Sequence, residues 1–408
     1  MGIIKNIGSI FSRQNTTPPV RKKVVAKNSP EKIAKKLKKD LAQNKKTEEK
    51  NNMSDKKVRV AINGFGRIGR AFVRQAMEIE GIEIVAINDL GNIENLAYLL
   101  KYDTVYKKAH FAVEVLDKGV QADPKKPEVV AVPGKLKVGN SEVVFVSEKV
   151  PEKLPWGSLN VDVVIESTGL FTKFGDAKVH IKAGAKKVVI SAPAKDDPTS
   201  ADEATVLMGI NDEKLKTCVV TSNASCTTNA ASPLISILDE AIGIEKALLS
   251  TTHGYTASQA LVDAPNKKDF REGRAAAQNI VPSSTGAAIA VTKAFPKLDK
   301  LFDGISLRVP VPAGSIVDVT FIAKRETTTE EVNAILKKAA TDKKWEGIFS
   351  ATEEDLVSSD ILGEPFASIA DLQFTRVVGG NLVKVMAWYD NESGYTRTLI
   401  KHVIAIGQ

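Results

Sequence analysis

The stretch that decides the fold is VRVAINGFGRIGRAF, residues 58–72. Its first part is a short run of β-branched and apolar residues, typical of a buried strand, and its last part has the spacing of an amphipathic helix. Gly64, Gly66 and Gly69 stand between them in G-x-G-x-x-G spacing. Glycine at these positions lets the chain turn sharply from a strand into a helix that packs closely against it. The stretch therefore predicts the first strand, turn and helix of a parallel sheet.

The glycine pattern is weak evidence by itself, and the next segment adds to it. A second strand is predicted over residues 82–89, and Asp89 ends it 20 residues after Gly69. The first turn of a helix binds phosphate through its free N–H groups, and a carboxylate at the end of the next strand binds ribose hydroxyls. Together these features predict a dinucleotide site; the alternative is a glycine-rich turn without a ligand.

Short Val/Ile-rich runs alternate with amphipathic segments as far as Cys226, which predicts a Rossmann-type, doubly wound parallel sheet. The expected strands there include 161–169 and 186–193, and the expected helices are 67–78, 92–103 and 173–185. Beyond Cys226 we expect helices over 230–242 and 329–342, a polar loop over 265–285, and strands over 245–256, 304–311, 316–324 and 382–390. This second half predicts an α+β domain with a mainly antiparallel sheet.

At 408 residues the chain is longer than one core usually organises. We expect an α/β protein in three parts. These are a basic extension over residues 1–55, a nucleotide-binding domain over 56–225 that a C-terminal helix at 391–408 completes, and a second domain over 226–390.

The net charge of +8 is concentrated in the extension, where residues 1–55 carry 14 basic and 5 acidic side chains. The basic balance therefore says nothing about nucleic-acid binding by the rest of the chain. A composition rich in Lys and Asn is typical of a disordered tail. The alternatives are a targeting or membrane-surface segment, which amphipathic stretches at 1–13 and 29–41 would suit, or an upstream start codon that is not used. Only two cysteines, eight residues apart, argue for a reducing, cytoplasmic setting.

The stretch TSNASCTTNAASP, residues 221–233, raises the question of what Cys226 does. A lone cysteine is often a small buried hydrophobe, and Cys218 fits that description. Cys226 fits it poorly, because polar residues surround it and a helix is expected to begin there. A thiol at a helix N-terminus is expected to be more acidic than usual. Of the four histidines, His253 closes a predicted strand and is the favoured partner, although position alone leaves this open.

Six motifs occur in order along the chain: NGFGRIGR, SNASCTTN, TTHGYTASQ, STGAA, SLRVPVP and WYDNESGY. Together they closely resemble phosphorylating glyceraldehyde-3-phosphate dehydrogenase, from about Lys56 to the C-terminus. The resemblance implies a glycolytic enzyme that converts glyceraldehyde 3-phosphate and inorganic phosphate to 1,3-bisphosphoglycerate while reducing NAD. It also implies a homotetramer, in which residues 226–390 form the catalytic and tetramerisation domain and the loop from about Tyr255 to Gln278 reaches a neighbour's cofactor pocket.

The resemblance assigns roles to individual positions. Cys226 would add to the aldehyde to form a hemithioacetal and then a thioester, with His253 accepting the proton and the N–H of Cys226 holding the oxyanion. The cofactor positions are Gly64, Gly66, Arg67, Ile68, Gly69, Asp89, Ser167, Thr168, Ser191 and Asn391, the last as partner of the nicotinamide carboxamide. The substrate-phosphate positions are Thr256 and Arg308, and the attacking-phosphate positions are Ser225, Thr227, Thr285 and Gly286, with Arg274 nearby. No metal site is expected, and Arg274 fits a solvated or subunit-contact charge equally well.

Other functions remain open at this point. They are the related erythrose-4-phosphate dehydrogenase activity, and a binding role carried by the basic extension; neither a nucleic acid nor a membrane is expected to be required for activity. Asp89 favours NAD, whereas Ala264 in the loop leaves more room beside the ribose than the family's usual leucine. Two departures from the family are an enlarged surface hairpin expected over 117–140 and the extension itself, since Met53 stands where chains of the family commonly begin.

Overall fold

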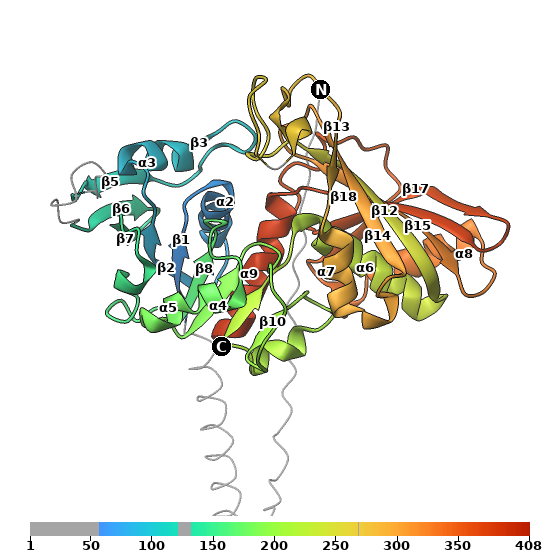
Figure 1. Cartoon of the computed structure of the whole chain (residues 1–408), viewed down its shortest axis with the longest axis horizontal. Helices are drawn as coiled ribbons and strands as arrows, with labels where there is room; N and C mark the ends of the chain where they lie inside the picture. The colour runs from blue at the N-terminus through green and yellow to red at the C-terminus, as the bar shows by residue number, and fades with distance from the viewer. Residues whose placement is uncertain (1–56, 121–131, 268) are drawn as a thin grey trace, which may run out of the picture. The chain divides into compact units, whose positions relative to one another are not determined.

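The computed structural model describes residues 57–120, 132–267 and 269–408. The expectations about residues 1–55 lie outside the described residues. Two sheets organise the described chain, and each one supports its own hydrophobic core (Figure 1). No helix in the described ranges is both long and apolar enough to span a membrane.

The first sheet has nine strands within the described residues. Its order is β10 (Glu203–Thr205), β11 (Val220–Ser222), β9 (Lys187–Ile190), β8 (Val163–Glu166), β1 (Val58–Asn63), β2 (Ile82–Asn88), β7 (Ser141–Val146), β6 (Gly134–Val138) and β5 (Val113–Asp117). The seven strands from β10 to β7 are parallel, and β6 and β5 add to that edge in antiparallel pairings. The central strands are buried except for Arg59 in β1 and Lys187 in β9, because helices cover both faces of a doubly wound sheet.

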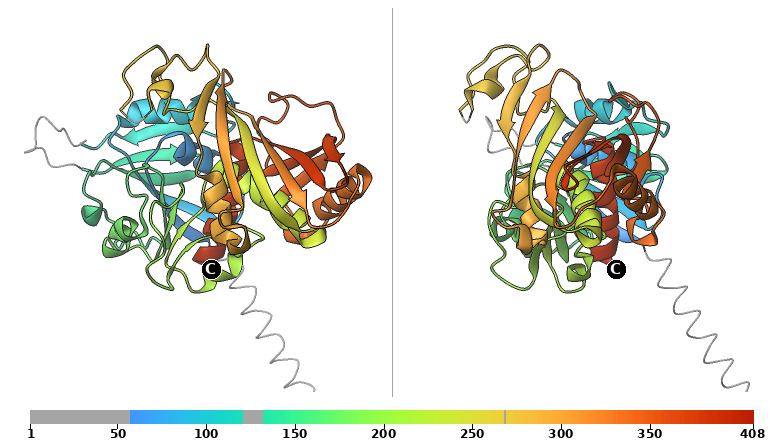
Figure 2. Two further views of the ribbon diagram at one scale, coloured as in Figure 1. Left: turned by 45° about the vertical axis from the view of Figure 1, so that its right-hand side comes forward. Right: turned by 90° about the vertical axis from the view of Figure 1, so that its right-hand side faces the viewer.

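Helices α2 (Arg67–Ala76) and α3 (Ile93–Lys101) follow the first two strands. The C-terminal helix α9 (Ser393–Gly407) returns to this sheet and contacts α2, β1, β8 and β9, with Leu399, Val403 and Ile406 in the core. Figure 1 shows α9 between the two sheets, and both views in Figure 2 place its C-terminal end near the lower edge of the described chain. It also contacts α6 of the second domain. The helix expected over 173–185 is instead two short helices, α4 (Phe174–Ala177) and α5 (Val179–Lys182), which meet at Lys178.

The second sheet has seven strands within the described residues. Its order is β13 (Val281–Ser284), β14 (Phe302–Val309), β12 (Ile244–Gly254), β15 (Ser315–Ala323), β18 (Leu382–Tyr389), β17 (Ser368–Val378) and β16 (Phe349–Thr352). Four of its six pairings are antiparallel, and β12–β14 and β16–β17 are parallel. The predicted fold class, a Rossmann-type parallel sheet with a mainly antiparallel α+β partner, is confirmed.

One face of the second sheet is covered and the other is not. Strand β15 alternates strictly between buried and half-buried residues. Its buried side chains belong to one core with α6 (Cys226–Ala241), which contacts β15, and α8 (Thr329–Ala340), which contacts β16 and β17. The opposite face exposes large apolar side chains, including Leu248 at 66% and Ile305 at 54%. Helix α7 (Ala287–Ala294) packs against α6 and β14.

Two segments differ from, or extend beyond, the sequence expectations. The polar loop expected over 265–285 contains a short 3₁₀ helix at Phe270–Gly273 and ends in strand β13, because the apolar Val281 pairs into the sheet beside Arg308. In the predicted hairpin over 117–140, Val120 and Val132 form a bridge that extends the β5–β6 pair. The tip of that hairpin, residues 121–131, lies outside the described residues.

The glycine-rich turn after β1 uses its three glycines differently. Gly64 has φ +97°, and a Cβ there would lie 2.6 Å from the backbone nitrogen of Thr168. A Cβ at Gly69 would lie 2.4 Å from the carbonyl oxygen of Gly64, so this glycine lets α2 approach the strand. A Cβ at Gly66 would meet nothing within 4 Å. The first and third glycines therefore serve packing, and the second leaves space open in front of α2.

This difference predicts that alanine destabilises the fold at Gly64 and has little effect on its stability at Gly66. Gly64→Ala should lower the free energy of unfolding by about 2 kcal/mol or more, because the left-handed backbone and the contact with Thr168 are both unfavourable for a Cβ. Gly66→Ala should change it by less than about 0.5 kcal/mol. Urea unfolding of the two variants measures this, and equal losses would contradict the assignment of packing to Gly64.

Candidate active site

Cys226 lies where the chain leaves the first sheet and enters the second domain. Strand β11 ends at Ser222, and Cys226 is the first residue of α6. Ser225 is the N-cap, and its hydroxyl oxygen accepts a hydrogen bond from the N–H of Thr228 at 3.1 Å. A Ser N-cap satisfies one of the unpaired donors of the first turn. The sequence SCTTN thus starts a helix at the residue that carries the thiol.

The turn before the helix is strained and held from both sides. Ala224 is fully buried with φ 54°, a left-handed conformation that costs a non-glycine residue about 1–2 kcal/mol. Its N–H donates to the hydroxyl of Ser222 at 3.1 Å, and its carbonyl accepts from the hydroxyl of Tyr395 at 3.2 Å. Such strain persists only where the surroundings hold it, and it is common at functional sites. Here it turns the start of α6 toward the second sheet.

The imidazole of His253 faces the thiol from the end of β12. The Nδ1 atom lies 2.6 Å from the carbonyl oxygen of Gly254, and because a carbonyl only accepts, Nδ1 carries the proton. The other nitrogen, Nε2, lies 3.3 Å from Sγ of Cys226 and accepts a hydrogen bond from the thiol. The ring of Tyr389 packs edge-on against His253 with centroids 5.9 Å apart. The tautomer and the orientation of the ring both point its lone pair at the sulfur.

Burial opposes charge on either partner taken alone. It raises the pKa of the Cys226 thiol, against the lowering effects of the Arg308 guanidinium, the Thr227 hydroxyl and nearby backbone N–H groups. It lowers the pKa of His253 to about 3, with Arg308 acting in the same direction and the Gly254 carbonyl opposing. The expectation that the helix N-terminus makes this thiol more acidic is therefore wrong for the isolated group, because the lost hydration outweighs the N–H groups.

A half-buried cation, Arg308, lies beside the pair. Arg308 on β14 is in register with His253 on β12, so the two side chains come from adjacent strands. Its Nε and Nη1 atoms are buried without a hydrogen-bond partner among the described residues. Unpaired guanidinium nitrogens are costly in a protein interior unless a ligand satisfies them. Arg308, Cys226 and His253 line one cavity of about 320 Å³, which makes the guanidinium a candidate anion site.

The same cavity reaches the nucleotide domain. Its other lining residues include Ile68 at the start of α2, Ser191 after β9, and Asn391 before α9. The side-chain oxygen of Asn391 accepts from the N–H of Gly314 at 3.0 Å and from the hydroxyl of Ser315 at 3.2 Å. No acceptor among the described residues is bonded to its amide nitrogen, which is therefore available to a carbonyl oxygen in the cavity.

Comparison with known proteins identifies the family. The model for the NAD binding domain of glyceraldehyde 3-phosphate dehydrogenase matches residues 58–174, and the model for its C-terminal domain matches residues 225–391. The chain is 46% identical over 353 residues to the glyceraldehyde-3-phosphate dehydrogenase of Streptomyces coelicolor, covering 86% of this chain and 98% of that one. The chain belongs to the glyceraldehyde-3-phosphate dehydrogenase family. The enzymes of that name from Geobacillus stearothermophilus and Clostridium pasteurianum are 44% and 43% identical over 345 and 348 residues, covering 84% of this chain and 96% of each enzyme.

As a member of the glyceraldehyde-3-phosphate dehydrogenase family, the chain is an NAD-dependent enzyme. The described residues fit this cofactor. The open space at Gly66 lies in front of the first turn of α2, where the N–H groups of Arg67 and Ile68 have no intrahelical partner. The carboxylate of Asp89 is held by the N–H groups of Phe65 and Gly91, both at 2.7 Å, at the end of the second strand. These groups would hold the pyrophosphate and the adenosine ribose.

Two other cofactor positions implied by the family serve the turn itself. The hydroxyl of Ser167 donates to the carbonyl oxygen of Gly64 at 2.7 Å. The N–H of Thr168 donates to the buried carboxylate of Glu166 at 2.9 Å, and its hydroxyl donates to the same oxygen. The Ser167 side chain therefore holds the glycine-rich turn in place, whereas that of Thr168 is bonded to Glu166.

The positions predicted for phosphate lie in different places. Ser225 and Thr256 line the cavity with Arg308. Thr227 is buried, and its hydroxyl pairs with that of Tyr389 at 2.9 Å. Thr285 and Gly286 precede α7, and Arg274 pairs with Asp263 at 2.9 Å on the surface; none of these three lines the cavity.

Some site residues were missed by the sequence interpretation. Tyr389 is fully enclosed and joins the hydroxyls of Thr227 and Thr251, the latter at 2.7 Å, beneath the ring of His253. Tyr395 and Glu392 line the cavity from the start of α9. All three lie in the motif WYDNESGY, in which the resemblance gives a role only to Asn391.

The buried His402 makes the stability of the fold depend on pH. His402 on α9 is fully buried; its Nδ1–H donates to Asn223 Oδ1 at 3.0 Å, and its Nε2 accepts from the Thr221 hydroxyl at 2.8 Å. Burial lowers the pKa of His402 to about 3. A depressed folded-state pKa gives stability that is present above the unfolded pKa of about 6.5 and is lost as the pH falls toward the folded value.

We expect His402→Gln to reduce the acid sensitivity of the fold. Between about pH 6.5 and about pH 5 the neutral His402 should account for roughly 2 kcal/mol of the loss in unfolding free energy. Urea unfolding at about pH 7 and about pH 5 measures this. The loss in unfolding free energy should be larger by that amount in the wild type than in His402→Gln. Equal losses in the two proteins would mean that His402 is not kept neutral by the fold.

Proposed function

We propose that the chain is a phosphorylating glyceraldehyde-3-phosphate dehydrogenase that oxidises glyceraldehyde 3-phosphate in the presence of inorganic phosphate to 1,3-bisphosphoglycerate. The observation that carries this proposal is the 3.3 Å contact of Cys226 Sγ with His253 Nε2 beside the unpaired guanidinium of Arg308. A nucleophile, a base and an anion site in one cavity match an aldehyde that carries a phosphate. The relatives' names support the same substrate.

The first step is addition of the Cys226 sulfur to the aldehyde carbon. As the bond forms, the thiol proton moves to His253 Nε2, and Nδ1–H keeps its bond to the Gly254 carbonyl. The carbonyl oxygen becomes the hemithioacetal oxygen, near the N–H groups of the first turn of α6. The imidazolium gives its proton to that oxygen, which forms the hemithioacetal hydroxyl and returns His253 to its neutral form. His253 then takes the hydroxyl proton while the carbon loses hydride, and a thioester remains on Cys226.

The penalty of burial is offset when both partners are charged together. A thiolate and an imidazolium at 3.3 Å attract by on the order of 5 kcal/mol at an effective dielectric constant of about 20. Burial disfavours the thiolate or the imidazolium when either is charged alone, and their mutual attraction offsets part of that cost when both are charged. The two groups therefore titrate as one coupled pair.

NAD supplies the hydride acceptor. The chain's part is to orient it, with α2 and Asp89 at the adenosine end and the amide nitrogen of Asn391 at the carboxamide. We assign the substrate phosphate to Arg308 and Thr256. The attacking phosphate is assigned to the hydroxyl of Ser225, which lines the cavity, and not to Thr285, Gly286 or Arg274, which do not.

We also propose that the subunit forms a homotetramer. The exposed face of the second sheet carries Leu248, Leu301 and Leu382 around an apolar hollow of about 380 Å³ between β12, β14 and β15. Contiguous exposed apolar surface of this kind marks an interface with another protein. A second copy of the same face is the occupant that the family resemblance suggests.

The mechanism predicts distinct consequences for the two catalytic side chains. Cys226→Ser should abolish phosphate-dependent NADH formation with glyceraldehyde 3-phosphate and leave NAD affinity within about twofold, because a hydroxyl is a far poorer nucleophile than a thiolate. His253→Asn should lower the single-turnover rate by about 10²–10⁴-fold.

Cys218→Ala is the matched control, since Cys218 is buried away from the cavity, and it should stay near wild-type activity. Full turnover by Cys226→Ser would contradict the proposed mechanism. Erythrose 4-phosphate is the comparison substrate. A kcat/KM higher for erythrose 4-phosphate than for glyceraldehyde 3-phosphate would make erythrose 4-phosphate the substrate of this enzyme.

Cofactor choice follows from Asp89. Its carboxylate, fixed by Phe65 and Gly91, accepts from ribose hydroxyls and repels a 2′-phosphate. We expect kcat/KM for NAD to exceed that for NADP at least about tenfold, and Asp89→Ala to narrow the ratio. A value for NADP equal to that for NAD would show that the small Ala264 in the loop outweighs the carboxylate.

A further inference from the structure

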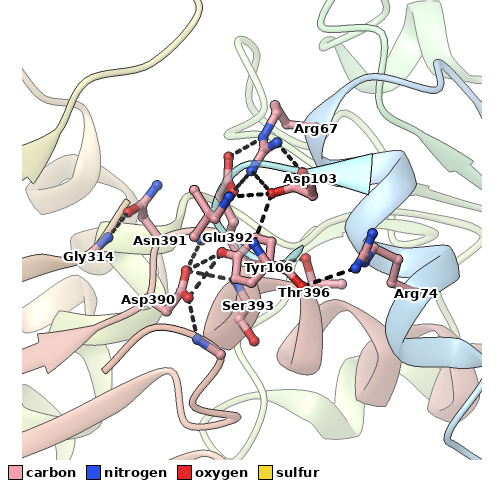
Figure 3. A network of polar contacts seen from close by, with 12 residues as sticks. Arg67, Arg74, Asp103, Tyr106, Gly314, Asp390, Asn391, Glu392, Ser393 and Thr396 are labelled. Carbon is pink, nitrogen blue, oxygen red and sulfur yellow. Dashed lines mark hydrogen bonds and ion pairs between the residues drawn. The ribbon is translucent and has the colours of Figure 1, made fainter. Parts of the chain in front are cut away.

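Three consecutive residues just before α9 are Asp390, Asn391 and Glu392, and the middle one is held from a different side than its two neighbours. Asn391, the residue assigned to the nicotinamide carboxamide, is bonded through its oxygen to Gly314 and Ser315 of the second sheet. Its neighbours Asp390 and Glu392 both bond to the first sheet's side of the site, as Figure 3 shows. The position of the Asn391 amide therefore depends on contacts that its neighbours make.

Glu392 is held by the guanidinium of Arg67, the first residue of α2. Arg67 Nε donates to one carboxylate oxygen at 2.8 Å, and Nη2 forms an ion pair with the other. Arg67 Nη1 pairs with Asp103, so the guanidinium lies between two carboxylates. We call Arg67, Asp103 and Glu392 the Arg67 clamp. The carboxylates of Asp103 and Glu392 are 8% and 12% exposed, which makes the ion pairs less screened than those on the surface.

Asp390 is anchored to the same segment. It is fully buried and accepts hydrogen bonds from the Tyr106 hydroxyl at 2.8 and 3.0 Å and from the N–H of Gly363 at 2.8 Å. The Tyr106 ring also lies under the guanidinium of Arg67, 5.9 Å from its centroid. Burial and the charges of Asp390 and Glu392 raise the pKa of Tyr106, so its hydroxyl remains a donor. Both flanks of Asn391 thus end on the segment 103–106 and on α2.

The location of the clamp argues for a role at the cofactor. Arg67 and Glu392 both line the cavity that contains Cys226 and Asn391, and the Arg67 side chain is 38% exposed there. A carboxylate–guanidinium fork fixes distance and angle as well as attraction. A fork between the first residue of α2 and the residue after Asn391 ties the pyrophosphate end of the site to the carboxamide end.

We infer that the side chain of Arg67 is a positioning residue for the nicotinamide half of NAD, acting through Glu392 on Asn391. The clamp holds the start of α9 so that the Asn391 amide meets the carboxamide at a fixed distance from the glycine-rich turn. This inference rests on NAD as cofactor and on the proposed role of Asn391, and it does not depend on the aldehyde substrate.

The test compares binding of NAD with binding of ADP-ribose, which lacks the nicotinamide ring. Calorimetric titration of Arg67→Gln should show a Kd for NAD about tenfold weaker, about the loss of one charged hydrogen bond. The Kd for ADP-ribose should change less than about twofold. Arg67→Lys keeps the charge without the fork and should recover only part of the loss.

Two further variants separate the inference from a general loss of structure. Asn391→Ala should show the same selective loss, and adding Arg67→Gln to it should weaken NAD no further, because both act through one contact. Arg325→Gln is the matched control, since Arg325 forms a fork with Glu331 at 3.1 and 2.7 Å away from the cavity, and it should bind both ligands as wild type does.

Equal weakening of NAD and ADP-ribose in Arg67→Gln would overturn the inference and assign the side chain to the pyrophosphate. Unchanged binding of both would overturn it as well, as would additive losses in the double variant. The wild-type assay with glyceraldehyde 3-phosphate reports on the proposed reaction independently, so a failure of one does not imply a failure of the other.

Discussion

The contact between Cys226 and His253 is the constraint on which the arrangement of this protein depends. The thiol begins a helix that leaves the first sheet, and the imidazole ends a strand of the second sheet. A separation of 3.3 Å between their side chains requires the carboxyl ends of β11 and β12 to meet at one point. The strained Ala224, the N-cap Ser225 and the buried Tyr389 beneath the imidazole all serve this meeting.

Helix α9 supports the contact between Cys226 and His253 from the other side. It packs into the core of the first sheet, and its buried His402 and Tyr395 bond to Asn223 and Ala224, just before the thiol. Its first turn follows Asn391 and Glu392, which line the cavity. One helix therefore sets both the strand end that presents the nucleophile and the amide assigned to the cofactor. The bonds to Asn223 and Ala224 join residues 179 and 171 positions apart in the chain, so they form only when α9 has packed onto the first sheet.

The sequence predicts much of this because the decisive features are local. Gly64, Gly66 and Gly69 are visible as spacing, and a serine before a helix-like run at Cys226 indicates the cap. Side-chain directions are different, because they depend on neighbours that are distant in the chain. Thr227 has the right residue type for a phosphate site, yet its hydroxyl bonds to Tyr389. Likewise, the effect of burial on the Cys226 thiol cannot be judged from its neighbours in sequence.

The central claim is that His253 makes Cys226 reactive although burial opposes the thiolate. The direct measurement is the rate of alkylation of Cys226 as a function of pH, in a Cys218→Ala background, for the otherwise wild-type protein and for His253→Asn. Our account predicts that the half-maximal rate occurs at a pH roughly one unit or more higher in His253→Asn, because the thiolate loses the imidazolium that offsets its burial. Coincident pH profiles would contradict it.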